Sequence, residues 1–166
     1  LSLHRYSQNN SLQEAAELIT HSACDIYQID AASLWNLEGN RLLPISAYER
    51  ESQAHVANEV FDASGFPDYL EALHTSRSTD AHNATRDPRT RELAASLRRG
   101  DVSAMLAASI RIDGQVVGVL CLEQIGSTRV WQSDEIAFAG ELADQFAQGI
   151  NNHNRRAATN ALHLFQ

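Results

Sequence analysis

The sequence predicts an α+β domain in which an antiparallel sheet is covered by helices on both faces. Apolar residues recur at helical spacing near both ends of the chain, and two pairs of strand-like runs lie between them. Each pair is joined by a short turn, which indicates two β-hairpins and therefore an antiparallel sheet. We expect the terminal helices to cover one face of this sheet and the irregular segment between the hairpins to cover the other.

The first expected helix spans residues 11–29, where apolar side chains recur every three or four positions. Ser11 and Glu14 stand at the spacing of a capping box, so we expect the helix to begin at Ser11. The apolar residues at this spacing are Leu12, Ala15, Ala16, Ile19, Ala23 and Ile26.

The first hairpin is expected directly after this helix. Its strands span 31–37 and 41–48, and the turn at 38–40 contains glycine and asparagine. Pro44 has no backbone N–H to donate, which favours an edge position for the second strand.

Between 49 and 100 the pattern weakens into two short helices, expected at 66–77 and 87–99, with an extended link at 78–81. Residues that favour helix starts and ends stand at matching positions, with Asp87 as the expected N-cap of the second helix: Pro67, Asp87, Pro88 and Gly100.

The second hairpin has the clearest signal in the chain. Two runs rich in β-branched and apolar residues, 102–112 and 115–124, are joined by Asp113 and Gly114. A helical pattern then runs from Ser133 to Phe165 near the end of the chain. A helix of about 30 residues is longer than a compact domain usually needs, so we expect it to project or to pair with another helix.

Composition and charge narrow the possible partners. The 166 residues fit one domain, and the formal net charge of -8 comes from 21 acidic residues against 13 arginines, because the sequence has no lysine. Nucleic acid or an anionic membrane would need a positive face, whereas these arginines are scattered. We therefore expect no nucleic-acid partner and no direct membrane contact. The missing lysines also exclude Schiff-base and P-loop lysine chemistry.

Cysteine usage and hydropathy favour a cytoplasmic location. Cys24 and Cys121 are too few and too far apart for a disulfide framework. The chain has no signal-peptide pattern, and its longest apolar runs are too short to span a bilayer. Because the chain begins at Leu1 and not at Met, we expect it to be a piece of a longer protein.

The stretches "AASLWNLEGNRLL", "DAHNATRDPRTRELAASLRRGDVSAMLAASI" and "DGQVVGVLCLEQIGSTRVWQSDEIAFAGELADQFAQGI" cover much of the chain. Together they resemble the GAF domain of bacterial signalling proteins. The most specific parts are the Gly-Val-Leu-Cys-Leu-Glu strand, the Asp-Pro-Arg that begins at Asp87, and the Arg-x-Trp-x-x-x-Glu element at Arg129, Trp131 and Glu135.

This resemblance implies a six-stranded antiparallel sheet with a small-molecule pocket between one face and the middle helices. It also implies terminal helices that mediate homodimerisation on the other face, and a regulatory role beside an output domain in the same chain, such as a histidine kinase or a diguanylate cyclase. We therefore expect residues 1–166 to form a single sensory domain, with 151–166 as the start of a connecting signalling helix.

The chain departs from three chemistries known in this family. The cyclic-nucleotide signature includes an Asn-Lys pair, and this chain has no lysine. Bilin-binding members usually hold the pigment on a cysteine in the insert, whereas Cys24 and Cys121 lie elsewhere. Free methionine sulfoxide reductases of this fold use several cysteines around the pocket. We therefore expect none of these activities and no cofactor.

The expected ligand-binding residues are Trp35, Tyr48, Asp80, Arg89, Met105 and Glu123. Aromatic side chains on a sheet that faces an insert often form the wall of a pocket, although Trp35 and Tyr48 would equally fill a core. Arg89 lies at a helix N-terminus, where an anion could bind, and a solvated helix face is the alternative. Asp80 lies between two insert histidines, but no metal-binding spacing accompanies it and we expect no metal site.

Two interpretations stay open for the strand that contains Cys121 and Glu123. Glu123 could contact a ligand, although an ion pair with Arg129 across the turn is the simpler expectation. Cys121 could be a redox thiol, but no basic residue stands near it in sequence, so we expect a core residue.

No residue pair offers a nucleophile with an identifiable base, so we do not expect an enzyme. The leading hypothesis is a non-catalytic sensor domain that binds a small molecule, dimerises, or does both, to control an output domain. The alternative is a structural dimerisation module with a vestigial pocket. A well-lined pocket would favour the first, and a pocket filled by side chains such as Met105 and Phe66 would favour the second.

Overall fold

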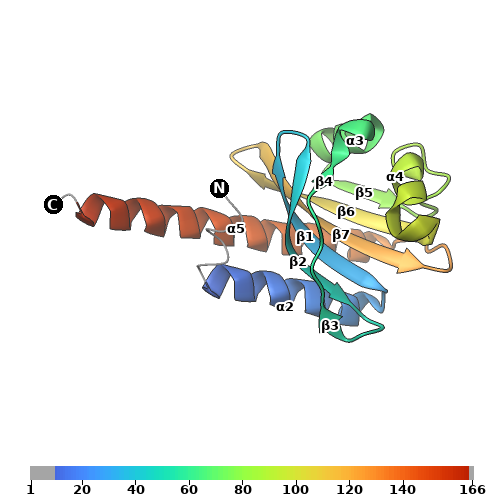
Figure 1. Cartoon of the computed structure of the whole chain (residues 1–166), viewed down its shortest axis with the longest axis horizontal. Helices are drawn as coiled ribbons and strands as arrows, with labels where there is room; N and C mark the ends of the chain where they lie inside the picture. Colours follow the sequence, from blue (N-terminus) through green and yellow to red (C-terminus); the bar gives the residue numbers. More distant parts are fainter. Residues whose placement is uncertain (1–9, 165–166) are drawn as a thin grey trace.

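The computed structural model describes residues 10–164, and its strands form one antiparallel sheet between two layers of helices (Figure 1). This confirms the predicted α+β class and the predicted division of the helices between the two faces. The strand order is β3-β2-β1-β7-β6-β5, with β4 also paired to β2. The strands are β1 (Ala31–Glu38), β2 (Arg41–Glu49), β3 (Ala54–His55), β4 (Phe61–Asp62), β5 (Ser78–Ala81), β6 (Val102–Ile112) and β7 (Gln115–Ile125).

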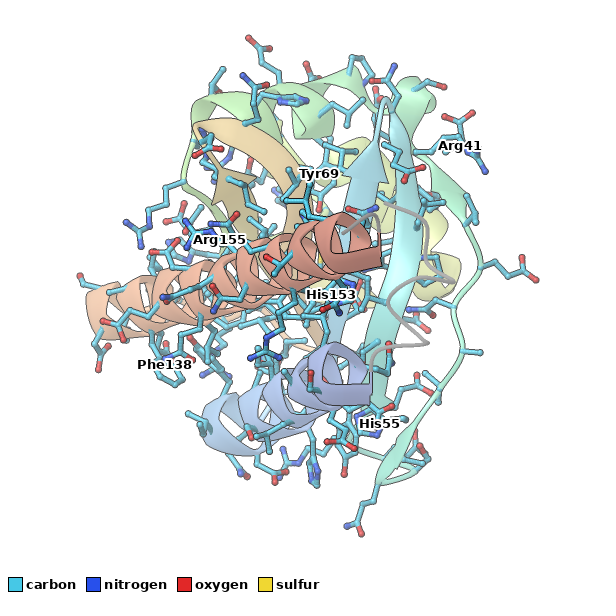
Figure 2. All side chains as sticks on the ribbon, turned by 90° about the vertical axis from the view of Figure 1, so that its left-hand side faces the viewer. Arg41, His55, Tyr69, Phe138, His153 and Arg155 are labelled. Carbon is cyan, nitrogen blue, oxygen red and sulfur yellow. The ribbon has the colours of Figure 1, made fainter. Side chains whose placement is uncertain are left out.

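The two long helices, α2 (Asn10–Tyr27) and α5 (Ser133–Leu164), lie next to each other on one face of the sheet (Figures 1 and 2). Because side chains alternate along a strand, one set from the central strands faces these helices. Leu34, Leu106 and Leu120 are fully buried there and belong to the same core cluster as Ala143 and Phe146 of α5.

The insert between the hairpins covers the opposite face. It contains η1 (Ala63–Gly65), α3 (Pro67–Thr75), α4 (Arg91–Ser96) and η2 (Leu97–Gly100). Met105, Val119 and Cys121 point from the sheet into a second core cluster, which Tyr69 and Leu73 of α3 complete. The sheet is therefore buried on both sides, which explains why β6 and β7 read as nearly continuous apolar runs.

The predicted turns and strand ends are largely as observed. Asp113 and Gly114 have φ angles of 52° and 77°, the left-handed pair that a two-residue hairpin turn requires. Pro44 lies in the part of β2 that neither β3 nor β4 pairs with, since β4 pairs with β2 before it and β3 pairs with β2 after it. Pro67 starts α3 at its first turn, as expected.

Three local expectations were wrong. The structure has α2 already helical at Asn10, so Ser11 lies inside the helix. Helix α4 begins at Arg91 and not at Asp87, because Asp87 instead forms a turn in which its Oδ1 accepts the Arg89 N–H at 2.9 Å. The sheet has one strand more than the resemblance implied, because β3 and β4 are two-residue strands with no pattern of their own. Phe165, the last position of the helical pattern, lies outside the described residues.

The loop between β7 and α5 is fastened to the end of β5. Trp131 is 3% exposed, and its indole Nε1 donates to the Ala81 carbonyl at 3.2 Å while its backbone N–H donates to His82 Nδ1 at 3.0 Å. The ring packs edge-on against Tyr27 with 6.2 Å between centroids, and the Arg129 guanidinium lies 4.8 Å from its centre. One indole therefore joins β5, α2 and the entry to α5.

Two glycines lie close to neighbouring atoms, one against the backbone of another strand and the other against a side chain. A Cβ on Gly118 of β7 would lie 2.3 Å from the Trp35 backbone oxygen on the neighbouring strand, which cannot move without breaking the sheet. A Cβ on Gly140 of α5 would lie 2.9 Å from Nε of Arg77, an exposed and flexible side chain.

We predict that Gly118→Ala lowers the free energy of unfolding by about 2 kcal/mol or more, because the sheet must shift to admit the methyl group. Gly140→Ala is the matched control, and it should change stability by less than about 1 kcal/mol, since alanine favours the helix and Arg77 can turn away. Urea unfolding of both variants measures the difference. Equal losses would contradict this account of the β1–β7 contact.

We also predict that Trp131→Ala costs about 3 to 5 kcal/mol, the usual range for removing a buried aromatic side chain. Trp131→Phe should cost less, because a ring is kept while the bond to Ala81 is lost. Glu123→Ala should be the mildest of the three. Thermal and urea unfolding test this order, and it is wrong if Glu123→Ala unfolds first.

Candidate functional site

A cavity of about 430 Å³ lies on the insert side of the sheet, near β1 and β2. Its size is within the range of pockets that hold small organic molecules. We refer to it as the β1–β2 cavity. It is lined by Ala31, Ala32, Ser33, Trp35, Ala47, Glu49, Val56, Ala57, Asn58, Glu59, Val60, Phe61, Leu97 and Glu123.

The outer wall of this cavity is the segment of residues 57–60, which runs between β3 and β4 (Figure 1). The segment is attached at both ends, because Val56 N–H donates to the Ala47 carbonyl at 3.0 Å and Phe61 pairs with Leu42. Alanines at 31, 47 and 57 keep the space between this segment and the sheet open. The cavity therefore depends on small side chains and on a segment with only its ends in the sheet.

Two predicted ligand-binding residues, Trp35 and Glu123, both line this cavity. The antiparallel pairing of β1 with β7 places Ala31 opposite Glu123, four residues along β1 from Trp35. The indole Nε1 of Trp35 donates to Ser33 Oγ at 2.8 Å, which orients the ring. An indole whose N–H is already bonded offers its apolar surface to a ligand.

Tyr48 does not lie in the β1–β2 cavity, which corrects the expectation from sequence. It is 5% exposed and packs on the helix side, where its ring stacks on His21 of α2 with 4.3 Å between centroids. The cause is a bulge in β2, because Trp35 pairs with Pro44 while Leu34 pairs with Ser46. One extra residue moves every later side chain to the opposite face.

Asp80 and Arg89 come together, but at the other edge of the sheet and away from the β1–β2 cavity. Arg89 Nη1 lies 3.4 Å from Asp80 Oδ1, and its Nη2 lies 2.7 Å from Asp87 Oδ2. The Arg89 hydrogen bond holds the pKa of Asp87 below its usual value. The guanidinium of Arg89 is thus already paired with carboxylates of this chain. This supports a structural role for Arg89 and not a role in binding an anion.

Met105 is a core residue and not part of the cavity lining. It is 1% exposed and lies in the centre of the insert-side core. Phe66 packs against the same core and stacks on Phe61, with 5.5 Å between centroids. These side chains fill the middle of the insert side and leave the open space at its β1–β2 end.

The predicted ion pair between Glu123 and Arg129 is replaced by another. Arg129 Nη2 is hydrogen-bonded to Glu135 Oε2, and Nη1 donates to the Tyr27 carbonyl at 2.8 Å. Glu135 also accepts the Gln132 N–H at 3.0 Å, so its carboxylate caps the first turn of α5. Although partial burial raises the pKa of Glu135, the bonds from Gln132 and Arg129 bring it below its usual value.

Both cysteines are buried, which confirms the prediction that they are core residues. Burial raises the pKa of Cys121 to about 12, and Tyr69 Oη lies 3.3 Å from its sulfur. Burial likewise raises the pKa of Cys24 to about 12. A thiol that stays protonated at neutral pH is a poor nucleophile, so neither cysteine suits redox or covalent chemistry.

Sequence reasoning missed most of the cavity wall. Residues 56–61 show neither helical nor strand periodicity, and Leu97 was expected to belong to a longer helix. Over residues 10–164, no group of three or more His, Cys, Asp or Glu side chains is arranged to hold a metal ion. Among the helices that the structure describes, none is long and apolar enough to cross a membrane.

Comparison with known proteins agrees with this geometry. The profile of the GAF domain matches residues 11–150. The blue-light absorbing form of the PixJ GAF domain from Thermosynechococcus elongatus superposes with a TM-score of 0.79 at 21% identity, covering 96% of this chain and 97% of that one. The GAF domain of an Acinetobacter phosphoenolpyruvate-protein phosphotransferase gives 0.67 at 20% identity and 92% coverage of both chains. No curated protein matches this chain.

A third solved structure, the far-red absorbing dark state of JSC1_58120g3 with bound biliverdin IXa, has a TM-score of 0.73. Its identity to this chain is 13%, with 92% of this chain and 98% of that one covered. At such identities these likenesses establish the fold.

Proposed function

Because this chain belongs to the GAF domain family, whose members are generally regulatory modules that bind small molecules, we propose that it is a non-catalytic sensor whose ligand binds in the β1–β2 cavity. The observation that carries the proposal is the cavity itself, with Trp35 and Glu123 brought together in its lining. A concave site with apolar walls and a few polar groups is the usual form of a small-molecule site.

The lining suggests a ligand with an apolar body and a polar group. Trp35, Val56, Phe61 and Leu97 supply apolar surface, while Glu123 supplies a carboxylate. A covalently attached bilin does not fit these residues, because Cys24 and Cys121 are buried and neither lines the cavity. The bound molecule is therefore held without a thioether bond.

The route from the cavity to an output runs through the sheet to α5. Helix α5 continues from the sheet to Leu164, beyond the rest of the domain (Figure 1). This geometry suits a helix that enters a following output domain, such as a histidine kinase or a diguanylate cyclase, and residues 151–166 would be the connecting part.

The outer side of α2 supports the second half of the proposal, a homodimer through the terminal helices. Leu18 and Ile26 are 66% and 59% exposed, and on the same side of the helix Ser22 lies between them and Ala15 lies one turn before Leu18. We call these four residues the α2 stripe. Apolar residues gathered on one exposed face usually mark an interface.

One observation favours the alternative of a structural dimerisation module. Met105 and Phe66 occupy the centre of the insert side, so the open space is confined to one end of the sheet. Whether the β1–β2 cavity retains a ligand decides between the two functions.

We predict that the protein purified from the organism that makes it retains a small molecule, seen as added mass in native mass spectrometry. Ala47→Leu should lose this mass, because the larger side chain occupies the cavity. Ala158→Leu, on the exposed surface of α5, is the control and should keep it. The sensor proposal fails if no form retains mass, or if Ala47→Leu retains as much as the control.

We predict a dimer at high micromolar concentration in sedimentation equilibrium. Leu18→Glu should shift the protein to a monomer, since a charge in the α2 stripe cannot be buried without a partner. Val130→Glu is the matched control, because Val130 is 65% exposed but lies in the loop before α5. A wild-type monomer, or equal effects of both variants, would argue against this interface.

A further inference from the structure

The end of β5 and the entry to α5 are joined by three hydrogen bonds at Ala81 and His82. Arg129 N–H donates to the His82 carbonyl at 3.1 Å, and the indole of Trp131 donates to the Ala81 carbonyl. The third bond is of a different kind, because the backbone N–H of Trp131 donates to the imidazole Nδ1 of His82 at 3.0 Å. It is the one bond of the three whose acceptor can be lost to a proton.

A backbone N–H is only a donor, so the bond requires a lone pair on His82 Nδ1. The imidazole must therefore be neutral, with its hydrogen on Nε2, which lies 4.0 Å from Asp80 Oδ2. Protonation of Nδ1 would place two N–H groups against each other. Histidine is the side chain that ordinarily changes charge between about pH 5 and 8, and this one is 44% exposed and open to protons from solvent.

Charged groups from every neighbouring element surround the ring. On β5, Asp80 faces Nε2, and on the turn at 83–90 Asp87 is close enough for His82 to lower its pKa. Arg89 lies between these two carboxylates and bonds to both. Two carboxylates and one guanidinium thus lie around the ring.

On the other side of the ring, the charges are already paired. The guanidinium of Arg129 is turned away to Glu135 in the first turn of α5 and to the Tyr27 carbonyl. The bond from Trp131 can be made only by the neutral ring, whereas an ion pair with Asp80 can be made only by the protonated ring.

We propose that His82 is a proton-sensitive latch between the sheet and α5. Neutral His82 holds the Trp131 N–H and keeps the entry to α5 against β5. Protonated His82 releases that N–H and turns to Asp80, which loosens the loop that leads into α5. The latch lies at the β5 edge, whereas the β1–β2 cavity lies toward the other edge, so acidity and ligand would reach α5 as separate inputs.

Nuclear magnetic resonance of the full chain tests the latch at the Trp131 amide. We expect its hydrogen-exchange rate, corrected for the intrinsic dependence on pH, to rise on the order of tenfold between pH 8 and pH 5, since one hydrogen bond is lost. Its chemical shift should follow the same midpoint as the ring resonances of His82. Amides of the first turn of α5 should follow with smaller changes.

Two variants distinguish the latch from a loosening of the whole domain at low pH. His82→Asn keeps an acceptor near the position of Nδ1 but cannot titrate, so the Trp131 amide should stay protected throughout. His82→Ala has no acceptor, so this amide should exchange fast at every pH while the backbone bond from Arg129 persists. The proposal is overturned if wild type and His82→Asn change equally with pH, or if the Trp131 amide does not follow His82 in the wild type.

Discussion

The pairing of β1 with β7 is the contact on which the rest of this domain depends. It joins two hairpins that are far apart in sequence into one sheet, and Gly118 lets the strands approach closely at Trp35. Asp30 extends the contact beyond the strand end, because its carboxylate accepts the Ile125 N–H at 2.7 Å. Without this register, Glu123 and Trp35 would not line the same cavity.

The two faces of this sheet are packed differently. The helix side is packed by α2 and α5 and ends in the exposed α2 stripe. The insert side is packed in its centre by Met105 and Tyr69, and open at its β1–β2 end. In the proposed function, a ligand at that end would touch β1 and β2, whose other sides pack against α2, and α2 in turn packs against α5.

Features that depend on residues close together in sequence could be predicted, whereas features that depend on tertiary contacts could not. The Asp113-Gly114 turn, the helical repeat of α5 and the burial of Cys121 could all be predicted, because each rests on neighbours in sequence. Tyr48 was misplaced because no signal marks the β2 bulge that reverses its face. The cavity wall at 57–60 was missed because its position is set by attachments at its two ends.

The most direct test of this account compares hydrogen exchange in the protein as purified from its source with the same protein after unfolding, removal of small molecules and refolding. The account predicts faster exchange after stripping in residues 56–61 and around Trp35, restored when the removed small-molecule fraction is added back. Unchanged exchange in these segments, with or without that fraction, would contradict the claim that the β1–β2 cavity is a ligand site.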